Sequence, residues 1–514
     1  MHETILIIDY GSQYTQLIAR RLRELNVFCI VYPYHKISIR LIDKLKPSGI
    51  ILSGGPNSVL DRDAPKLNNF ILKLSIPILG ICYGLQLICS HLGGKIHKSK
   101  SREYGYALIS IFKKSSLLTG LKKNNNQVWM SHGDHVVKIP NEFEITSKSN
   151  NNLISSIENK KNKIFGLQFH PEVFHTKQGK KILYNFLFKI CKISKKFMIQ
   201  DFVRNKINQL KLQLKNKAVI CGLSGGVDSS VTAYLLHKAI GKNLYCIFVD
   251  HGLLRKNESK EVCNIFKKKF KKNFIKVDAS KLFIKKLLNI SDPEKKRKII
   301  GKTFIEVFEK ESKKLKNVNY LAQGTLYPDV IESISFFGGP TAKIKSHHNV
   351  GGLPKKMKLK IIEPLRELFK DEVRQVGKKL KLTSTLLNRH PFPGPGLAIR
   401  IPGKIDNDKI KLLQEVDDIY ISYLKEKKLY DKIWQAFAVL LPVKSVGVMG
   451  DERTYNYCVA LRAVTSVDGM TADFYMFKQN DFNELSSRII NTIKGVNRVL
   501  YDFTSKPPGT IEWE

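Results

Sequence analysis

The sequence predicts an α/β protein with two parallel-sheet domains and a small α+β domain after them. Over residues 1–190, short apolar runs alternate with amphipathic stretches, a pattern typical of parallel strands covered by helices. The alternation starts again at Lys217. After Arg389 it gives way to the Pro/Gly-rich stretch RHPFPGPGLAIR and to a hairpin pattern. We therefore expect three domains, at residues 1–192, 193–388 and 389–514.

The individual elements follow from the same patterns. In the first region we expect strands at ETILIIDYG, FCIVYPY, SGIILSGGP and IPILGICYG, and an amphipathic helix at QLIARRLREL. Apolar residues recur near helical spacing from Met198 to Leu214 and predict a bridging helix. The second region offers strands AVICG, LYCIFVDHG, FIKVDAS and NYLAQGT. The third offers a hairpin SVGVMG–DERTYN–YCVALRAV, a helix DFNELSSRIINTIKG and a strand RVLYDFT.

The charge balance is strongly basic, with 87 Lys and Arg against 45 Asp and Glu, a net charge of +42. Such a charge is typical of nucleic-acid binding. The excess here is mostly Lys, in runs with Asn such as KKNNN, as AT-rich coding favours. Nucleic-acid sites interleave Arg with aromatic residues, and the sequence has no such cluster. We therefore expect no nucleic-acid partner. We also expect no contact with a membrane, because no apolar run reaches the about 18 residues that a spanning helix needs.

Cysteine use indicates a reduced, cytoplasmic protein. There are 8 Cys in 514 residues, and none form a C-x-x-C pair, which excludes a disulfide scaffold and a zinc ribbon. The start MHETILIIDYGSQ has no basic segment and no cleavage site of a secretory signal.

The stretch CGLSGGVDSSVTAYLL predicts a phosphate-binding loop between a strand and a helix. Small residues leave backbone N–H groups open at the helix N-terminus, where an anion is stabilised. The loop residues are Ser224, Gly225, Gly226, Val227, Asp228, Ser229 and Ser230. Asp228 stands where γ-phosphate transfer would call for a Lys, and a carboxylate beside phosphates suits a bound cation. The motif resembles the AMP-forming ATP pyrophosphatases. The resemblance implies ATP as cofactor with Mg²⁺ at Asp228, and a loop that holds departing pyrophosphate.

GICYGLQ places Cys82 between an apolar strand and a helix, flanked by Gly80 and Gly84. This is the nucleophile-elbow pattern with sulfur in place of oxygen, and a helix N-terminus favours the thiolate. FGLQFHPEV offers His170 as base and Glu172 to orient it. Backbone N–H groups of Gly54, Gly55 and Tyr83 are candidates for binding an oxyanion. Each residue alone also suits a core or strand-end role.

Taken together, these residues resemble the class I glutamine amidotransferases, in which the Cys attacks the side-chain amide of glutamine and ammonia leaves. The resemblance implies a flavodoxin-like first domain and an adenine-nucleotide hydrolase-like second domain. It also implies that Gln86 and the segment SHGDH (131–135) lie near bound glutamine.

The whole chain is similar to the glutamine-hydrolysing GMP synthetases. The most specific pieces are VDHGLLRKNE, GTLYPDVIES, KSHHNVGGLP, RHPFPGPGLAIR and PPGTIEWE. The resemblance implies ATP-dependent amination of XMP to GMP in purine biosynthesis, through an adenyl-XMP intermediate, and a C-terminal domain that dimerises and binds XMP. It carries XMP contacts onto Arg255, Gln435, Lys506 and Glu512, and a lid onto Lys345, His347 and His348.

Three alternatives remain open at this point. A tRNA-modifying pyrophosphatase would fit the charge but has no need of a glutaminase. Another glutamine-fed synthetase, such as one for asparagine, would need Cys at position 2 if it used an N-terminal nucleophile, and His2 stands there. A non-catalytic RNA-binding descendant would not need Cys82, His170 and the phosphate loop intact.

Overall fold

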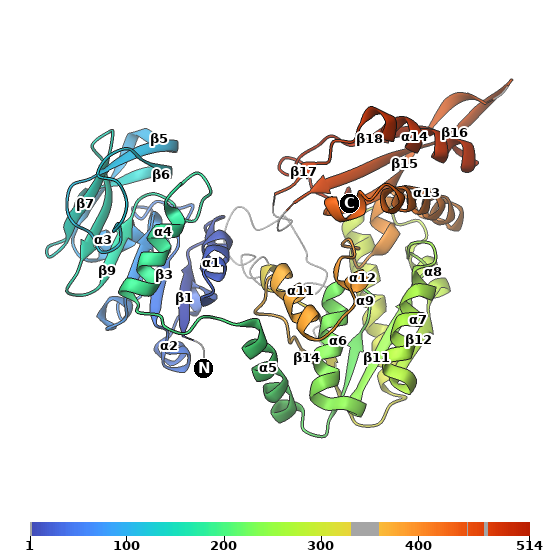
Figure 1. Cartoon of the computed structure of the whole chain (residues 1–514), viewed down its shortest axis with the longest axis horizontal. Coiled ribbons are helices and arrows are strands. Elements are labelled where there is room, and N and C mark those ends of the chain that lie inside the picture. Colours follow the sequence, from blue (N-terminus) through green and yellow to red (C-terminus); the bar gives the residue numbers. More distant parts are fainter. Residues whose placement is uncertain (1–2, 330–358, 450, 467–470) are drawn as a thin grey trace. The chain divides into compact units, whose positions relative to one another are not determined.

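The computed structural model describes residues 3–329, 359–449, 451–466 and 471–514. The chain forms two compact units, the first ending at Asp201 and the second starting at Phe202 (Figure 1). The predicted lid residues Lys345, His347 and His348 lie outside the described residues.

The first unit is built on a nine-stranded sheet in the order β2-β1-β3-β4-β9-β8-β7-β5-β6. Five neighbouring strands are parallel: β2 (Phe28–Pro33), β1 (Thr4–Asp9), β3 (Gly49–Leu52), β4 (Ile78–Ile81) and β9 (Ile164–Leu167). The helices of this unit are α1 (Thr15–Glu24), α2 (Ile39–Leu45), α3 (Tyr83–His91) and α4 (Gly179–Tyr184).

The alternation of the sequence predicts a parallel sheet over the whole region. This prediction is wrong for the second half of the sheet. The remaining strands pair antiparallel: β8 (Ile154–Asn159), β7 (Glu144–Ser149), β5 (Lys95–Ile111) and β6 (Asn126–Lys138). Their order lets β6 pass beside the start of α3, so the antiparallel extension contributes to the site described below.

Burial explains why the parallel strands form. Ile5, Leu6, Ile7 and Ile8 of β1 are all fully buried, as a central strand covered on both faces requires. The helix α1 buries Ile18 and Leu22 and turns its polar side outward. The first core therefore follows directly from the apolar runs of the sequence.

The turn from β4 into α3 is tightly constrained. Cys82 lies between the two elements with φ 51° and ψ −103°, a conformation that L-residues rarely adopt. A Cβ on Gly80 would lie 2.6 Å from the carbonyl carbon of Gly84. A Cβ on Gly84 would lie 2.5 Å from the carbonyl oxygen of Leu52. The glycines on both sides of Cys82 are thus required by close backbone packing, as the elbow pattern predicts.

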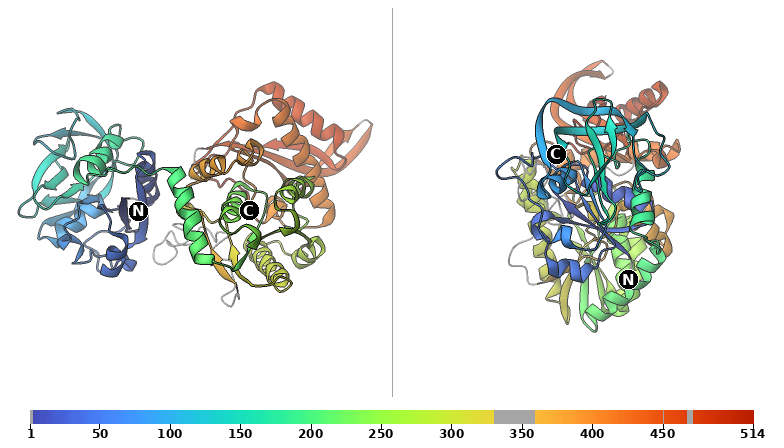
Figure 2. Two further views of the ribbon diagram at one scale, coloured as in Figure 1. Left: turned by 60° about the horizontal axis from the view of Figure 1, so that its bottom comes forward. Right: turned by 90° about the vertical axis from the view of Figure 1, so that its left-hand side faces the viewer.

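The predicted bridging helix, α5 (Ile199–Leu214), starts in the first unit and continues into the second; the left view of Figure 2 shows it as a single unbroken helix. A five-stranded parallel sheet follows in the order β12-β11-β10-β13-β14. Its strands are β10 (Ala218–Gly222), β11 (Leu244–Asp250), β12 (Phe274–Asp278), β13 (Val318–Ala322) and β14 (Lys360–Ile362). The helices are α6 (Val227–Ile240), α7 (Glu258–Phe270), α8 (Ser280–Leu287), α9 (Pro293–Ser312), α11 (Lys370–Lys379) and α12 (Ser384–Leu387).

A second, four-stranded sheet completes this unit. It contains β15 (Gln435–Met449), β16 (Glu452–Thr465), β17 (Asp473–Phe474) and β18 (Val496–Tyr501). The predicted hairpin is β15–β16, although Glu452–Asn456, expected in the turn, already belongs to β16. The helices α13 (Asn407–Glu426) and α14 (Gln479–Thr492) pack on each other and on the sheet. The sequence analysis had not predicted α13.

One continuous apolar core joins the two sheets of the second unit. It contains Ile220 and Ile247 from the parallel sheet and Leu440 and Leu461 from the other. Between them lies the short helix η6 (Gly396–Arg400), which is fully buried although the sequence marked it as a Pro/Gly-rich break. Over the part of the chain that is described, no helix is both long and apolar enough to cross a membrane.

Candidate active site

The first candidate site lies at the carboxyl end of β4, where Cys82 begins α3. The imidazole of His170 contacts the Cys82 thiol, and its Nδ1 lies 2.7 Å from Oε1 of Glu172. His170 and Glu172 follow β9, the strand next to β4. All three side chains are buried. The structure therefore brings together the predicted nucleophile, base and orienting carboxylate.

The pKa of His170 is raised well above its ordinary value. Burial alone would lower it, but the charge of Glu172, and after it the contact with Cys82, outweighs burial. The imidazolium is thus favoured beside the sulfur. A thiolate–imidazolium pair is the reactive form of a cysteine nucleophile.

The predicted oxyanion residues also lie at this site. A Cβ on Gly54 would come within 3.1 Å of the His170 ring, and one on Gly55 within 3.2 Å of the Tyr83 ring. Both glycines therefore let the loop after β3 approach the nucleophile closely. The amide of Tyr83 belongs to the first turn of α3, whose N–H groups have no partner within the helix.

Strand β6 forms another wall of the site. The thiol of Cys82 points to the carbonyl oxygen of Ser131 at 3.6 Å. Gln86, one turn into α3, donates from Nε2 to the carbonyl oxygen of Asp134 at 2.9 Å. The segment 131–135 and Gln86 thus lie together near Cys82.

Two further side chains at this site escaped the sequence analysis. The amide of Gln168 lies 3.7 Å from the sulfur of Cys82, and the ring of Tyr14 packs edge-on against His170 at 5.0 Å. Gln168 stands two residues before His170, inside the quoted motif FGLQFHPEV. That position was the available signal, whereas nothing in the sequence placed Tyr14 there.

The second candidate site is the loop between β10 and α6, at the carboxyl edge of the parallel sheet. Gly225 has φ +80°, and a Cβ there would lie 2.5 Å from Val262. The loop is held by its own serines. Ser224 N donates to Oγ of Ser229 at 3.2 Å, and Oγ of Ser230 donates to the carbonyl of Gly226 at 2.6 Å. Backbone N–H groups at a helix N-terminus are suited to phosphate.

Asp228 lies in the first turn of α6 and forms an ion pair with Lys370, Oδ2 to Nζ 2.8 Å. Its other oxygen, Oδ1, is buried and accepts no hydrogen bond from the described residues. Lys370 begins α11, which is 142 positions further along the chain. Sequence spacing carries no signal for such a contact, so the sequence analysis missed this cation at the loop.

A buried ion pair connects the phosphate loop to the predicted XMP residue Arg255. Arg389 donates to the carbonyl of Gly225 at 3.1 Å and to Oε1 of Glu258 at 2.6 Å. Oε2 of the same carboxylate accepts the backbone N–H of Arg255 at 3.0 Å. Glu258 is almost fully buried, and a buried carboxylate of this kind requires both partners.

Three of the four predicted XMP residues lie close together. The guanidinium of Arg255 donates to the carbonyl of Ala436 at 3.0 Å and pairs with Asp417 at 3.1 Å. Next to Ala436, Gln435 donates from Nε2 to Oε1 of Glu512 at 2.6 Å. The pKa of Arg255 is raised; burial opposes the rise, and Asp417 and Glu258 contribute most to it, with Glu512 adding to them.

The fourth residue, Lys506, precedes Glu512 in the chain. Its backbone pairs with Ala472, N to O 2.7 Å and O to N 3.1 Å.

Three fully buried cations hold residues 510–514, the tail that carries Glu512. Arg400 donates from Nε and Nη2 to the two carboxylate oxygens of Glu512, at 3.1 and 2.8 Å. Arg462 donates to the carbonyls of Ile511 and Thr510, at 3.0 and 3.1 Å. Lys296 of α9 donates to a carboxylate oxygen of Glu514 at 2.5 Å. The bidentate pair sets the plane of the Glu512 carboxylate.

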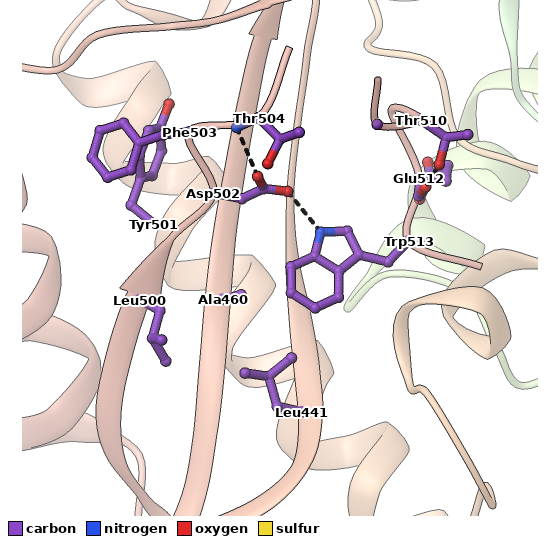
Figure 3. Close-up of a pocket in the computed structure, with 11 residues that line it drawn as sticks. Leu441, Ala460, Leu500, Tyr501, Asp502, Phe503, Thr504, Thr510, Glu512 and Trp513 are labelled. Atoms are coloured by element: carbon purple, nitrogen blue, oxygen red, sulfur yellow. Dashed lines mark hydrogen bonds between the residues drawn. The ribbon is translucent and has the colours of Figure 1, made fainter. Parts of the chain in front are cut away.

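A cavity of about 470 Å³ lies where this tail crosses the four-stranded sheet (Figure 3). Its wall combines apolar groups of the sheet, such as Leu441 and Leu500, with Glu512 and Trp513 of the tail. Trp513 is held by a hydrogen bond from Nε1 to Asp502, 2.9 Å long. An apolar recess with a few fixed polar groups is typical of small-molecule sites.

All eight cysteines lie in the described ranges, and all are free thiols. Burial raises the pKa of Cys89 and of Cys221 to about 12. Among the described residues, no group of three or more His, Cys, Asp or Glu is placed to hold a metal ion.

Comparisons with known families match this arrangement. Residues 6–190 match the family described as glutamine amidotransferase class-I, residues 197–299 match NAD synthase, and residues 422–513 match the GMP synthase C terminal domain.

Two relatives named GMP synthase [glutamine-hydrolyzing] match along the whole chain. The protein of Brachyspira hyodysenteriae is 55% identical over 512 residues, which cover 100% of this chain and 99% of the relative. That of Bradyrhizobium diazoefficiens is 52% identical over 515 residues, 100% of this chain and 93% of the relative. A solved glutamine amidotransferase of Thermotoga maritima is 21% identical, with a TM-score of 0.29, and the match covers 38% of this chain and 87% of that one. The full-length identity to the two relatives shows that this chain belongs to the glutamine-hydrolysing GMP synthase family.

Proposed function

We propose that the chain aminates XMP to GMP with ATP and with ammonia from glutamine, releasing AMP, pyrophosphate and glutamate. The proposal rests on one observation: a single chain contains two sites whose side chains are already arranged for chemistry. One holds Cys82 against His170 and Glu172. The other holds a phosphate loop beside Asp228 and Lys370. One suits the release of ammonia and the other the activation of its acceptor.

In the first site, the sulfur of Cys82 attacks the amide carbon of glutamine. The oxygen of that amide becomes negative and takes hydrogen bonds from backbone N–H groups near Gly54, Gly55 and Tyr83. His170 gives its proton to the leaving nitrogen, so ammonia departs and a thioester remains. Water then cleaves the thioester to glutamate, and the thiol is restored.

In the second site, the purine oxygen of XMP attacks the α-phosphorus of ATP and pyrophosphate leaves. The loop from Ser224 to Ser230 offers its backbone N–H groups to that pyrophosphate, and Lys370 adds a positive charge. Ammonia then attacks the adenylated carbon and AMP leaves, which gives GMP.

A Mg²⁺ ion fits this site. Oδ1 of Asp228 is buried and accepts no hydrogen bond from the described part of the chain. Magnesium binds through one or two carboxylates together with substrate phosphates. Asp228 would hold the ion, which would neutralise phosphate charge when ATP is bound.

We assign XMP to the group of Arg255, Gln435 and Glu512, with Lys506 as a further contact. Arg255 suits the phosphate of XMP and Glu512 suits N–H groups of the purine. Their contacts with each other and with Arg400 support the assignment, because they hold these polar groups in fixed orientations.

The division into domains 1–192, 193–388 and 389–514 is part of this proposal, supported by the three family matches. So is a cytoplasmic location, which the free thiols support. In the same way we propose a homodimer through residues 389–514. The second sheet exposes Val443, Val446, Val448 and Tyr455 on its long hairpin, and exposed apolar groups of this kind mark an interface.

The dimer is tested by light scattering on the full chain. We expect the mass of two chains at micromolar concentration, and Val448→Glu should shift the protein toward one chain. A wild-type protein that is monomeric at every concentration would contradict the proposal.

The reaction itself is tested by separating the nucleotides formed from XMP, ATP, Mg²⁺ and glutamine. We expect GMP with equal amounts of AMP and pyrophosphate. Cys82→Ala should abolish this synthesis with glutamine while free ammonia still supports it, because the thiol is needed only for the release of ammonia. Equal loss of both activities would show that the two sites do not divide the work in this way.

The role of Glu172 is tested by Glu172→Gln. The carboxylate charge raises the pKa of His170 against burial, so its removal lowers that pKa and disfavours the imidazolium. We expect glutamine hydrolysis to fall about 10²-fold or more, measured from about pH 6 to about pH 9. Ammonia-dependent synthesis should not change. The exposed Glu144→Gln is the matched control, and equal effects of the two changes would refute the assignment.

The XMP site is tested by Glu512→Gln, which removes the charge but keeps the shape. Because a hydrogen bond to a charged group is worth about 1.5–3 kcal/mol, we expect the KM for XMP to rise roughly tenfold or more. Glutamine hydrolysis in the absence of XMP should remain. Glu415→Gln, a surface position paired with Lys256, should leave the KM unchanged. An unchanged KM in a folded Glu512→Gln protein would remove Glu512 from the site.

A further inference from the structure

We propose that Gln168 is a further residue of the glutamine-hydrolysing site, where its amide N–H donates to the sulfur of Cys82 while that sulfur is negatively charged. The inference rests on the proposed function, since it concerns the same nucleophile. It adds a second hydrogen-bond donor to the sulfur, besides His170.

The backbone places Gln168 beside the nucleophile. Gln168 follows directly after β9, and its N–H donates to the carbonyl of Ser155 at 2.9 Å. The preceding carbonyl, that of Leu167, accepts the N–H of Cys82 at 2.6 Å. Cys82 and Gln168 are therefore fixed across neighbouring strands. The side chain of Gln168 is 1% exposed, so water does not compete for its amide.

A chain of hydrogen bonds decides which end of the amide faces the sulfur. The carbonyl of Asp134 can only accept, so the Gln86 atom 2.9 Å away must be the donor Nε2. That same nitrogen lies 3.5 Å from Gln168, which must therefore present its oxygen Oε1 there. The NH₂ end of Gln168 is left to point at Sγ of Cys82, 3.7 Å away. The chain Asp134–Gln86–Gln168–Cys82 ends on the sulfur with a donor.

A neutral hydrogen-bond donor at this place stabilises the negatively charged sulfur at steps where His170 alone does not. When the thiol has given its proton to His170, the negative sulfur is buried, and a buried charge needs hydrogen bonds to be stable. The imidazolium must later give its proton to the leaving nitrogen. The amide of Gln168 keeps its N–H throughout, so it can also stabilise the sulfur when the thioester is cleaved.

The ionisable groups on the elements around Cys82 are few. His170 and Glu172 follow β9, and Tyr14 packs on His170. Strand β6 carries His132, Asp134 and His135, with Glu103 of β5 3.4 Å from His132. Gln168 itself does not titrate, so a change made there alters the sulfur without removing a charge from the wild-type site.

The test is the rate at which iodoacetamide alkylates Cys82 in the full chain, followed by peptide mass spectrometry across pH. Gln168→Glu keeps the shape and sets a carboxylate against the sulfur. We expect the midpoint of the rate–pH curve to move up by about one pH unit, the equivalent of roughly one hydrogen bond. Glutamine hydrolysis should lose about tenfold in kcat/KM. Gln168→Met, which fills the space without a donor, should move the midpoint in the same direction by less.

Two controls keep the result specific. Gln178→Glu makes the same chemical change at an exposed position on the same segment and should leave the curve in place. Ammonia-dependent synthesis should be normal in every variant, which reports that the chain is folded. A curve that stays at the wild-type position in both Gln168→Glu and Gln168→Met overturns the proposal. Failure of the proposed function would give a different result. The wild-type protein would then hydrolyse no glutamine, so alkylation of Cys82 would have no activity to inhibit.

Discussion

The first unit depends on the backbone of one residue, Cys82, held with φ 51° between β4 and α3. That conformation is unfavourable for a residue with a side chain, so the surrounding structure must impose it. Gly80 and Gly84 do so, because neither tolerates a Cβ against the backbone it touches. Once the turn is fixed, the sulfur lies at the start of α3 and points to the carbonyl oxygen of Ser131 on β6. The loop after β3, the end of β9 and strand β6 then meet around it. The placement of the nucleophile, of its base and of the groups around them thus follows from how closely α3 approaches β3 and β4.

Both units bury charge, and both do so in pairs. His170 is opposed by Glu172 in the first unit, and Arg389 by Glu258 in the second. Arg400 is bound at two points by Glu512 and also lies over the ring of Phe437 at 4.2 Å. Isolated buried charges are costly, whereas paired ones fix the orientation of both partners. The same groups that have to be paired for stability therefore set the geometry of the sites. Glu258 shows this most directly, since one carboxylate aligns both the phosphate loop, through Arg389, and the segment of Arg255.

The sequence was sufficient where function depends on neighbouring residues. The elbow around Cys82, the loop from Ser224 to Ser230 and the strands β10 to β13 each lie within a short stretch with its own periodicity or glycine pattern. It was insufficient where function depends on distant residues. Lys370 reaches Asp228 across 142 positions and Arg400 reaches Glu512 across 112, and no local pattern encodes such contacts. The antiparallel strands β5 to β8 were missed because alternating apolar runs do not specify strand direction. The helix α13 was not predicted, because the Pro/Gly-rich stretch before it indicated a break between domains. That stretch is instead buried in the core.

The way the tail is bound has a consequence for the order in which the second unit forms during synthesis. Residues 510–514 emerge from the ribosome long after Lys296, Arg400 and Arg462, which precede their partners in the tail by 218, 112 and about 49 positions. Until the tail arrives, Lys296 and Arg400, which end up fully buried, lack the carboxylates of Glu514 and Glu512 that pair with them. The core that surrounds them can therefore close only late, as a step that joins distant parts of the chain.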